Sequence, residues 1–214
     1  MSCFNEISEG VIKGNQNLVK EKVQELIDNG TDPLEIINQG LMAGMNIVGA
    51  RFKEGDMFVP EVMIAARAMG AGIALVKPLI NDADVSNAGK VVIGTVKGDL
   101  HDIGKNLVTM MIESAGFNVV NIGIDISPEK FAEAIKEHDP DIVGMSAMLT
   151  TTMTQMKETI DHLKNEGLRD SVKVIVGGAP VTQQFAEEIG ADGYSADASS
   201  AAELCKELVS LASA

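Results

Sequence analysis

The hydrophobic pattern of this 214-residue chain changes its period near residue 81, and that change limits the possible folds more than any other feature. Before it, apolar residues recur three and four positions apart, as they do along one face of an α-helix. After it, short apolar runs typical of strands alternate with helical segments. Two successive blocks with different periods predict two folded units of different architecture.

The first block predicts four helices. Asn29-Gly30 and Gly55 are typical of helix ends, whereas Asp32-Pro33 supplies the polar cap and the early proline that begin a helix. Four helices with short joints favour a small antiparallel bundle. We assign this helical unit to residues 1–82.

The second block predicts an α/β domain over residues 90–214, after a polar, turn-rich linker at 83–89. Strictly alternating strands and helices require right-handed crossovers, and these build a parallel sheet with helices on both faces. The expected architecture is a doubly wound, five-stranded Rossmann-like or flavodoxin-like domain. Its strands are expected at 91–95, 118–122, 142–146, 172–176 and near 193–194, and its helices near 104–115, 128–137, 152–166, 182–189 and 199–211.

Charge and cysteine content limit the partners and the compartment. The chain has 31 acidic and 17 basic residues, a formal net charge of -14, so its surface should repel nucleic acid and anionic membranes. Cys3 and Cys205 lie near opposite ends without zinc-site spacing, and we expect them to be free thiols. No basic and apolar leader opens the chain, and no apolar run near 18 residues is free of interruption, so a cytoplasmic protein is expected.

A histidine stands in the loop that follows the first predicted strand. The segment Gly98-Asp-Leu-His-Asp-Ile-Gly104 comes directly after the β-branched run 91–96. Ligands of open α/β sheets bind at the carboxyl ends of the strands, where this loop lies. The imidazole of His101 can coordinate a metal while Asp99 accepts the hydrogen of its other ring nitrogen. The plainer alternative is a loop histidine that caps the next helix.

Two further strand ends meet the same rim of the sheet. A hydroxyl-rich stretch from Ser146 to Thr152 follows the third strand, and Gly177-Gly178 follows the fourth. Singly, such segments are typical of a helix cap and a turn. Together they predict a slot for a large ligand between two loops, beside the histidine.

Asp99-x-His101-x-x-Gly104, Ser146-x-Met148 and Gly177-Gly178, in this order, resemble the signature of cobalamin-binding domains that take the cofactor with its nucleotide tail displaced. The helical first block resembles the cap that accompanies such a domain in cobalamin-dependent methionine synthase. Proteins with both parts at this length are similar to the methylamine, methanol and glycine betaine corrinoid proteins of methanogens and acetogens. The resemblance covers nearly the whole chain.

The resemblance implies a cobalt ligand and a relay behind it. His101 corresponds to the lower axial ligand, Asp99 to its hydrogen-bond partner, and Thr152 stands where the family has a serine. Phe58 falls in a cap segment whose aromatic side chain shields the upper face of the cofactor, although ordinary bundle core is the alternative. The implied cofactor-binding residues are Gly98, Asp99, Leu100, His101, Asp102, Ile103, Gly104, Ser146, Met148, Thr150, Thr152, Gly177, Gly178, Ala198 and Phe58. None of them is implied to be catalytic.

The resemblance further implies a methyl carrier that is no catalyst by itself. Such a protein accepts a methyl group on Co(I) of cobalamin or a related corrinoid from a substrate-specific methyltransferase. It then presents methyl-Co(III) to a second methyltransferase that acts on a thiol or a tetrahydrofolate-type acceptor, and a reductive protein reactivates it. The methyl donor would be a methylamine, a quaternary amine, methanol or a similar compound.

Three alternatives remain open from the sequence. The main one is an adenosylcobalamin-binding subunit of a carbon-skeleton mutase, which resembles residues 90–214 but has no need of the helical block. A cobalamin-sensing transcription regulator would need a basic DNA-binding module, and the acidic first half offers none. A flavodoxin-like domain without a metal is the third.

Overall fold

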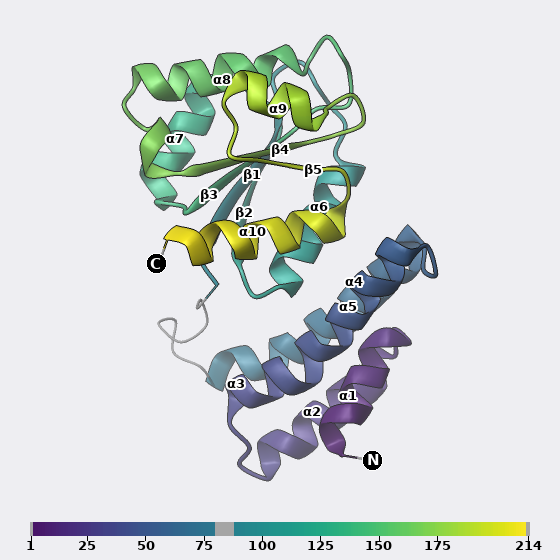
Figure 1. Ribbon diagram of the computed structural model, residues 1–214. Helices are drawn as coiled ribbons and strands as arrows, with labels where there is room; N and C mark the ends of the chain where they lie inside the picture. The colour runs from purple at the N-terminus through teal and green to yellow at the C-terminus, as the bar shows by residue number, and fades with distance from the viewer. Residues whose placement is uncertain (1, 80–87, 213–214) are drawn as a thin grey trace. The chain divides into compact units, whose positions relative to one another are not determined.

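The computed structural model describes residues 2–79 and 88–212, which form two compact units (Figure 1). One unit holds the N-terminal helices, and the other holds a sheet with the helices around it. The predicted linker at 83–89 lies outside the described residues except for Ala88 and Gly89.

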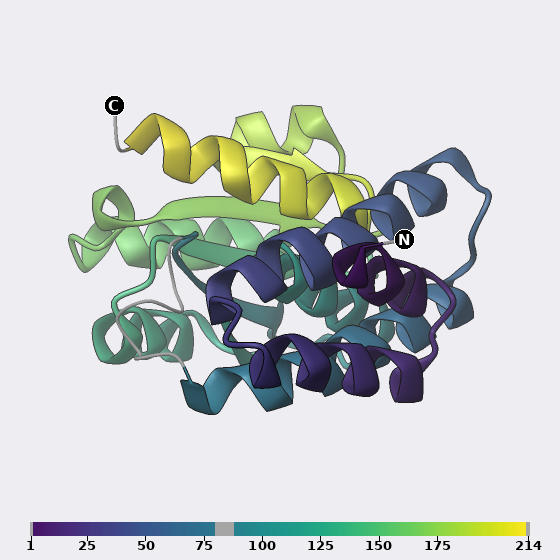
Figure 2. The same cartoon turned by 90° about the horizontal axis from the view of Figure 1, so that it is seen from below.

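The helical unit contains the four predicted helices, packed side by side (Figure 2). The third is continuous but changes its winding, because a π-helical segment joins two α-helical ones. Ser2, Asn15 and Asp32 cap successive helices through their side chains, and Gly55 ends the third with a φ of 81°. The elements are α1 (Cys3–Ile12), α2 (Gln16–Asp28), α3 (Pro33–Glu35), the π segment η1 (Ile36–Met42), α4 (Ala43–Glu54), α5 (Val59–Val76) and the short 3₁₀ turn η2 (Lys77–Leu79).

Helix α5 is the most apolar element of this unit. By length and composition alone, Val59–Leu79 would be able to cross a membrane, a test that the core helices of many soluble proteins also pass. Val62, Met69 and Val76 on one side of α5 are buried, and the helix packs against α1, α2 and α4. Helix α5 therefore forms part of the bundle core.

The second unit is a doubly wound α/β domain with five parallel strands in the order β2-β1-β3-β4-β5, which confirms the predicted fold class. Helices α7, α8 and α9 cover one face of the sheet, and α6 and α10 cover the other (Figure 1). The strands are β1 (Lys90–Val96), β2 (Asn118–Ile126), β3 (Ile142–Ser146), β4 (Lys173–Gly177) and β5 (Gly193–Ser195). The helices are α6 (Ile103–Ser114), α7 (Pro128–His138), α8 (Thr154–Asn165), the 3₁₀ turn η3 (Arg169–Ser171), α9 (Gln183–Ile189) and α10 (Ala198–Ala212).

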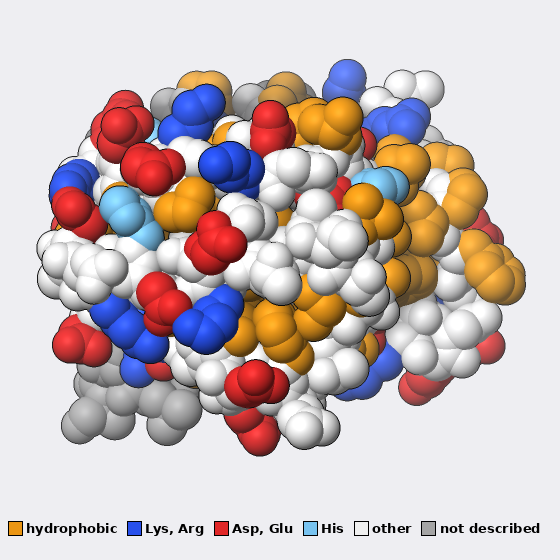
Figure 3. Space-filling model, turned by 90° about the horizontal axis from the view of Figure 1, so that it is seen from above, with side chains coloured by type: hydrophobic (Ala, Val, Ile, Leu, Met, Phe, Trp, Pro, Cys, Tyr) orange, Lys and Arg blue, Asp and Glu red, His pale blue; other side chains and the backbone are white. Residues whose placement is uncertain are grey.

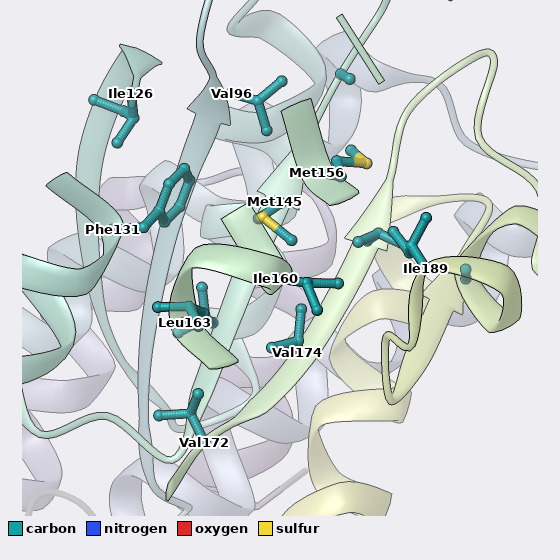
Figure 4. Close-up of a cluster of buried hydrophobic side chains, with 14 of the residues drawn as sticks. Val96, Ile126, Phe131, Met145, Met156, Ile160, Leu163, Val172, Val174 and Ile189 are labelled. Atoms are coloured by element: carbon teal, nitrogen blue, oxygen red, sulfur yellow. The ribbon is translucent and has the colours of Figure 1, made fainter. Parts of the chain in front are cut away.

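A buried apolar cluster lies between the sheet and helices α7 to α9 (Figure 4). Met145 of β3 and Val174 of β4 meet Ile160 of α8 there, and Phe131 of α7 is fully buried. Because the inner strands β1, β3 and β4 are covered on both faces, their sequences are mostly apolar runs without polar alternation. This core fixes the strand ends from which the loops of the next section emerge.

Strand β2 is longer than the sequence predicts and irregular at its carboxyl end. It continues to Ile126 instead of ending near Ile122, and its pairing with β1 shifts twice, between Asn121 and Ile126. Gly123 and Asp125 have positive φ angles of 97° and 54°, which a regular strand does not contain. Pairing with β1 therefore carries the strand past residues that locally favour a turn.

Candidate functional site

The loop between β1 and α6 holds His101 from one side only. Its backbone N–H and its ring Nδ1 lie 3.1 and 2.7 Å from Oδ1 of Asp99. Its carbonyl oxygen accepts a hydrogen bond of 2.9 Å from the hydroxyl of Thr95, a fully buried residue of β1. The His101 side chain is nevertheless 53% exposed, so the far edge of the ring is accessible.

Asp99 is fully buried, and both of its carboxylate oxygens are satisfied. Its second oxygen, Oδ2, accepts hydrogen bonds from the Thr152 hydroxyl at 2.6 Å and from the Met148 backbone N–H at 2.8 Å. Burial by itself raises the pKa of a carboxyl group, but the hydrogen bonds from Thr152, Met148 and His101 outweigh it and hold the pKa of Asp99 well below its usual range. The buried group is therefore a carboxylate.

The ionised state of Asp99 determines the tautomer of His101. A carboxylate only accepts hydrogen bonds, so Nδ1 of the neutral ring must carry the hydrogen. The lone pair then resides on Nε2, at the other edge of the imidazole. Thr152, Asp99 and His101 thus form a hydrogen-bonded chain that ends in a nitrogen able to coordinate a metal. Within residues 2–79 and 88–212 no group of three or more His, Cys, Asp or Glu side chains could hold a metal ion.

Exposed apolar side chains lie on the loops around this histidine. Leu100 and Ile103 of the β1–α6 loop region are 68% and 78% exposed, and Met148 and Leu149 after β3 are 40% and 44% exposed. Such gatherings on the surface mark places where an apolar ligand or partner binds. Figure 3 shows one face of the molecule, on which hydrophobic side chains form patches among polar and charged ones.

The glycines expected at the site have different surroundings. Gly98 adopts a φ of 79° in the turn before Asp99, and no neighbouring atom lies within 4 Å of the place where a Cβ on Gly104 would be. A Cβ on Gly178 would lie 1.8 Å from the carbonyl oxygen of Ala147, and one on Gly177 would lie 2.9 Å from that of Ser195. At these last two positions the chain's own backbone leaves no room for a side chain, and the role of Gly177 and Gly178 in binding a ligand stays a prediction.

The remaining predicted residues occupy three strand ends and one helix of the other unit. Ser146 ends β3 beside Gly177, Thr150 is exposed in the following loop, and Ala198 is buried at the start of α10. Asp102 accepts a hydrogen bond from Asn106 at 3.1 Å. Phe58 lies at the start of α5 and is 69% exposed, so it does not belong to the core of the bundle.

Sequence reasoning did not single out Thr95 and Asp125, and it named Met148 as a pocket residue without anticipating the role of its backbone N–H. Thr95 holds the carbonyl of His101, the backbone of Met148 holds Asp99, and Asp125 of β2 holds the loop backbone. Thr95 lies within an apolar strand and looks like part of it. Met148 acts through its backbone N–H, and Asp125 is 27 residues away from its partner Gly98 in the sequence. No local signal in the sequence marks such roles.

Two family models, both described as a B12 binding domain, match residues 3–77 and residues 89–203. Together they cover both units.

Similar proteins cover almost the full length of the chain. A corrinoid protein of Desulfitobacterium hafniense is 43% identical over 212 residues, 98% of each chain. A dimethylamine corrinoid protein of Methanosarcina barkeri is 47% identical over 207 residues, 96% of this chain and 97% of the relative. A chain of the methanol:cobalamin methyltransferase complex MtaBC from Methanosarcina barkeri superposes with a TM-score of 0.87 at 33% identity, over 97% of this chain and 80% of that one. The protein with the Thr152–Asp99–His101 chain of hydrogen bonds therefore belongs to the B12-binding corrinoid proteins.

Proposed function

We propose that this protein is the methyl carrier of a methyltransferase system, with His101 as the lower ligand of a corrinoid cobalt. The observation that carries the proposal is the outward Nε2 of an imidazole whose other nitrogen is held by a buried carboxylate. The protein accepts a methyl group from a substrate-specific methyltransferase and presents it to a second one that uses a thiol or tetrahydrofolate-type acceptor. It does not catalyse either transfer alone.

The residues around His101 fit a corrinoid. A corrinoid would bring most of the ligands of its own metal, so the single imidazole of His101 would be enough to hold the cobalt from the protein. Leu100, Ile103, Met148 and Leu149 offer exposed apolar surface to a large ring, and the open space at Gly104 lies in the first turn of the helix beside it. When bound, the corrinoid supplies a cobalt centre that takes up and releases the methyl group.

The chain's own residues orient the nitrogen that would hold the metal. The Asp99 carboxylate fixes the ring orientation and the tautomer that leaves the lone pair on Nε2, as carboxylates behind metal-bound histidines do. The hydroxyl of Thr152 and the N–H of Met148 hold Asp99 ionised inside the protein. Nε2 is the atom that would hold either the cobalt or a proton, so this chain of groups would couple the one to the other.

The relatives support a methyl donor from the methylated one-carbon compounds, such as a methylamine or methanol, because the names of the similar proteins refer to dimethylamine and methanol. The partners would be the two methyltransferases and a reductive protein that restores the reduced cofactor. A net charge of -14 supports a protein without nucleic acid or anionic membrane partners, and we place it in the cytoplasm as part of this proposal.

We assign residues 1–82 to a cap over the cofactor, 83–89 to a linker and 90–214 to the cofactor-binding domain. The separate family models for the two halves support this division. A fragment of residues 84–214 should take up cobalamin, whereas residues 1–80 should not. Uptake by the N-terminal fragment alone would contradict the division.

The axial role is tested by spectroscopy of the full chain loaded with hydroxocobalamin. His101→Ala should keep the fold and lose the visible spectrum of imidazole-ligated cobalt. His162→Ala, at a half-buried position in the last turn of α8, is the matched control and should retain the wild-type spectrum. Identical spectra for the wild type and His101→Ala would remove His101 from beneath the cobalt.

The carrier role is tested by methyl transfer. The reduced, cobalamin-loaded protein should be methylated stoichiometrically by a cognate substrate-specific methyltransferase, and the methyl group should pass on to a thiol or folate acceptor with a second enzyme. A protein that binds adenosylcobalamin and supports a carbon-skeleton rearrangement, but is not methylated, would be a mutase subunit instead.

A further inference from the structure

Asp125 contacts the histidine loop from the neighbouring strand β2. Its side-chain oxygen Oδ1 accepts a hydrogen bond of 2.7 Å from the backbone N–H of Gly98, and its own N–H donates one of 3.1 Å to the carbonyl oxygen of Asp99. One residue thus holds the backbone on both sides of the Gly98–Asp99 peptide. Asp99 is the residue whose carboxylate orients the ring of His101.

The backbone of Asp125 is held in a conformation that non-glycine residues seldom adopt. Among the described residues only Asp125 and Asp139 combine a side chain with a positive φ, 54° and 46° respectively. Asp139 ends helix α7, where a left-handed residue is common. Asp125 lies inside strand β2, where no helix end accounts for a positive φ. A residue keeps such an unfavourable backbone conformation only where its surroundings fix it.

A polar network fixes the irregular part of β2 that presents Asp125. Oδ1 of Asn121 accepts hydrogen bonds from Lys105 Nζ at 2.7 Å and from the Gly123 N–H at 3.1 Å. The amide of Asn121 also donates to Asn106 at 3.1 Å, and Lys105 is only 3% exposed. Lys105 and Asn106 belong to α6, the helix that follows the histidine loop. The bulged strand and the loop are therefore tied to the same helix.

Asp125 lies in the part of β2 where the pairing with β1 shifts its register twice. From Ile93 to Val96 strand β1 advances three residues, while β2 advances five, from Asn121 to Ile126. The two extra residues bend the strand and re-aim its side chains, as bulges do.

We propose that Asp125 is a positioning residue for His101. By holding the backbone of Gly98 and Asp99, it keeps the Asp99 carboxylate aligned with both Thr152 and the imidazole, and so sets how firmly the ring presents Nε2. This inference rests on the proposed role of His101 as the cobalt ligand. It adds a third layer to the relay, contributed by β2, which none of the sequence motifs contains.

Three substitutions separate the acceptor from the backbone conformation. Asp125→Asn retains an oxygen acceptor and tolerates a positive φ, Asp125→Gly retains only the conformation, and Asp125→Ala retains neither. Asp139→Ala is the matched control, because it changes the other left-handed aspartate, at the end of α7. Thermal unfolding of each full-length variant establishes that it is folded.

The first measurement uses hydroxocobalamin-loaded protein and follows the equilibrium between ligated and free imidazole in the visible spectrum. Asp125→Ala and Asp125→Gly should weaken ligation about 10-fold, the lower end of what outer partners of metal ligands contribute. Asp125→Asn and Asp139→Ala should stay near the wild type. Wild-type ligation in Asp125→Gly would overturn the proposal, because the acceptor would then be irrelevant.

The second measurement needs no cofactor. Nitrogen-15 NMR of the imidazole at about pH 8, above the ordinary histidine pKa, reports which ring nitrogen carries the hydrogen. The wild type and Asp125→Asn should show the Nδ1–H form, and Asp125→Ala and Asp125→Gly a mixture of both tautomers. An unmixed Nδ1–H form in all variants would overturn the proposal. Absence of imidazole ligation in the wild type would instead refute the proposed function, and the tautomer measurement would still decide the role of Asp125.

Discussion

Replacement of Thr152 by valine removes one hydroxyl from the relay and keeps the shape of the side chain. The oxygen Oγ1 of Thr152 lies 2.6 Å from Asp99 and 3.0 Å from the carbonyl of Leu149, but a hydroxyl has only one hydrogen to donate. The shorter contact, to a carboxylate, takes it. The Leu149 carbonyl also accepts the backbone N–H groups of Thr152 and Met153, so the substitution leaves only Asp99 short of a donor.

The hydrogen bond that is lost is charge-assisted and lies in the protein interior, away from solvent. Asp99 is fully buried and Thr152 is 7% exposed, so water does not replace the hydroxyl. A hydrogen bond to a charged group contributes about 1.5–3 kcal/mol, and the equal size of valine avoids a cavity. Urea unfolding of the cofactor-free protein at pH 7 should therefore give a free energy of unfolding lowered by about 2 kcal/mol.

The effect should depend on pH with a defined sign. Removal of a donor raises the pKa of Asp99 from its depressed value towards its usual range. A carboxyl group with a depressed pKa stabilises the fold above its unfolded pKa of about 3.9, and this stabilisation is lost as the pH falls through the folded-state pKa. The free energy of unfolding of Thr152→Val should thus fall short of the wild-type value by the full amount at pH 7, and this deficit should shrink below about pH 4.

Two further variants serve as controls. Thr152→Ser keeps the hydroxyl and should retain the wild-type dependence on pH, while Thr151→Val, at the exposed neighbour, should stay within about 0.5 kcal/mol of the wild type. The reasoning fails if Thr152→Val unfolds like the wild type at pH 7, or if its deficit persists unchanged in acid.

Three other predictions follow from exposure, close approach and burial. Phe58→Ala should leave the free energy of unfolding within about 0.5 kcal/mol but speed oxygen-dependent loss of the reduced cofactor; equal loss rates would mean that Phe58 shields nothing. Gly178→Ala should lower the free energy of unfolding by about 3 kcal/mol or more, because Gly178 has a φ of 129° and a Cβ there would lie 1.8 Å from a carbonyl oxygen. Gly30→Ala, whose Cβ would meet no atom within 4 Å, should lower it by only about 1 kcal/mol. Similar denaturation midpoints for the two variants would contradict the close contact. Burial raises the pKa of the Cys205 thiol to about 12, so at about pH 8 iodoacetamide should modify Cys205 only after unfolding and later than the half-buried Cys3, as peptide mass spectrometry would show.

The sequence predicts the α/β fold well because its signals are local and agree with one another. The apolar runs at 142–146 and 172–176 match β3 and β4 to within one residue, since buried parallel strands are apolar throughout. The π segment η1 carries no comparable signal, because residues 36–42 have the same apolar spacing that an α-helix would need. The sequence did not predict that β2 continues to Ile126, because Gly123 and Asp125 locally favour a turn. Pairing with β1 keeps these residues in the strand.

At the candidate site, motif residues were easier to find than the groups that hold them. Asp99 and His101 stand two residues apart, so their contact can be anticipated from spacing alone. The contacts of Asp99 with Met148 and of Gly98 with Asp125 span 49 and 27 residues and depend on how strand ends meet in space. Backbone donors such as the Met148 N–H carry no side-chain signature at all.

The irregularity of β2 also bears on solubility. In the order β2-β1-β3-β4-β5 the strands β2 and β5 are the two borders of the sheet, and a long, flat border strand can recruit strands from other molecules. Strand β5 is only three residues long, and β2 is broken by two bulges near its carboxyl end. Both borders therefore offer a poor template for intermolecular strand pairing. In the proposed role of a carrier that meets two methyltransferases in turn, borders that discourage self-association would keep the molecule free to bind its partners.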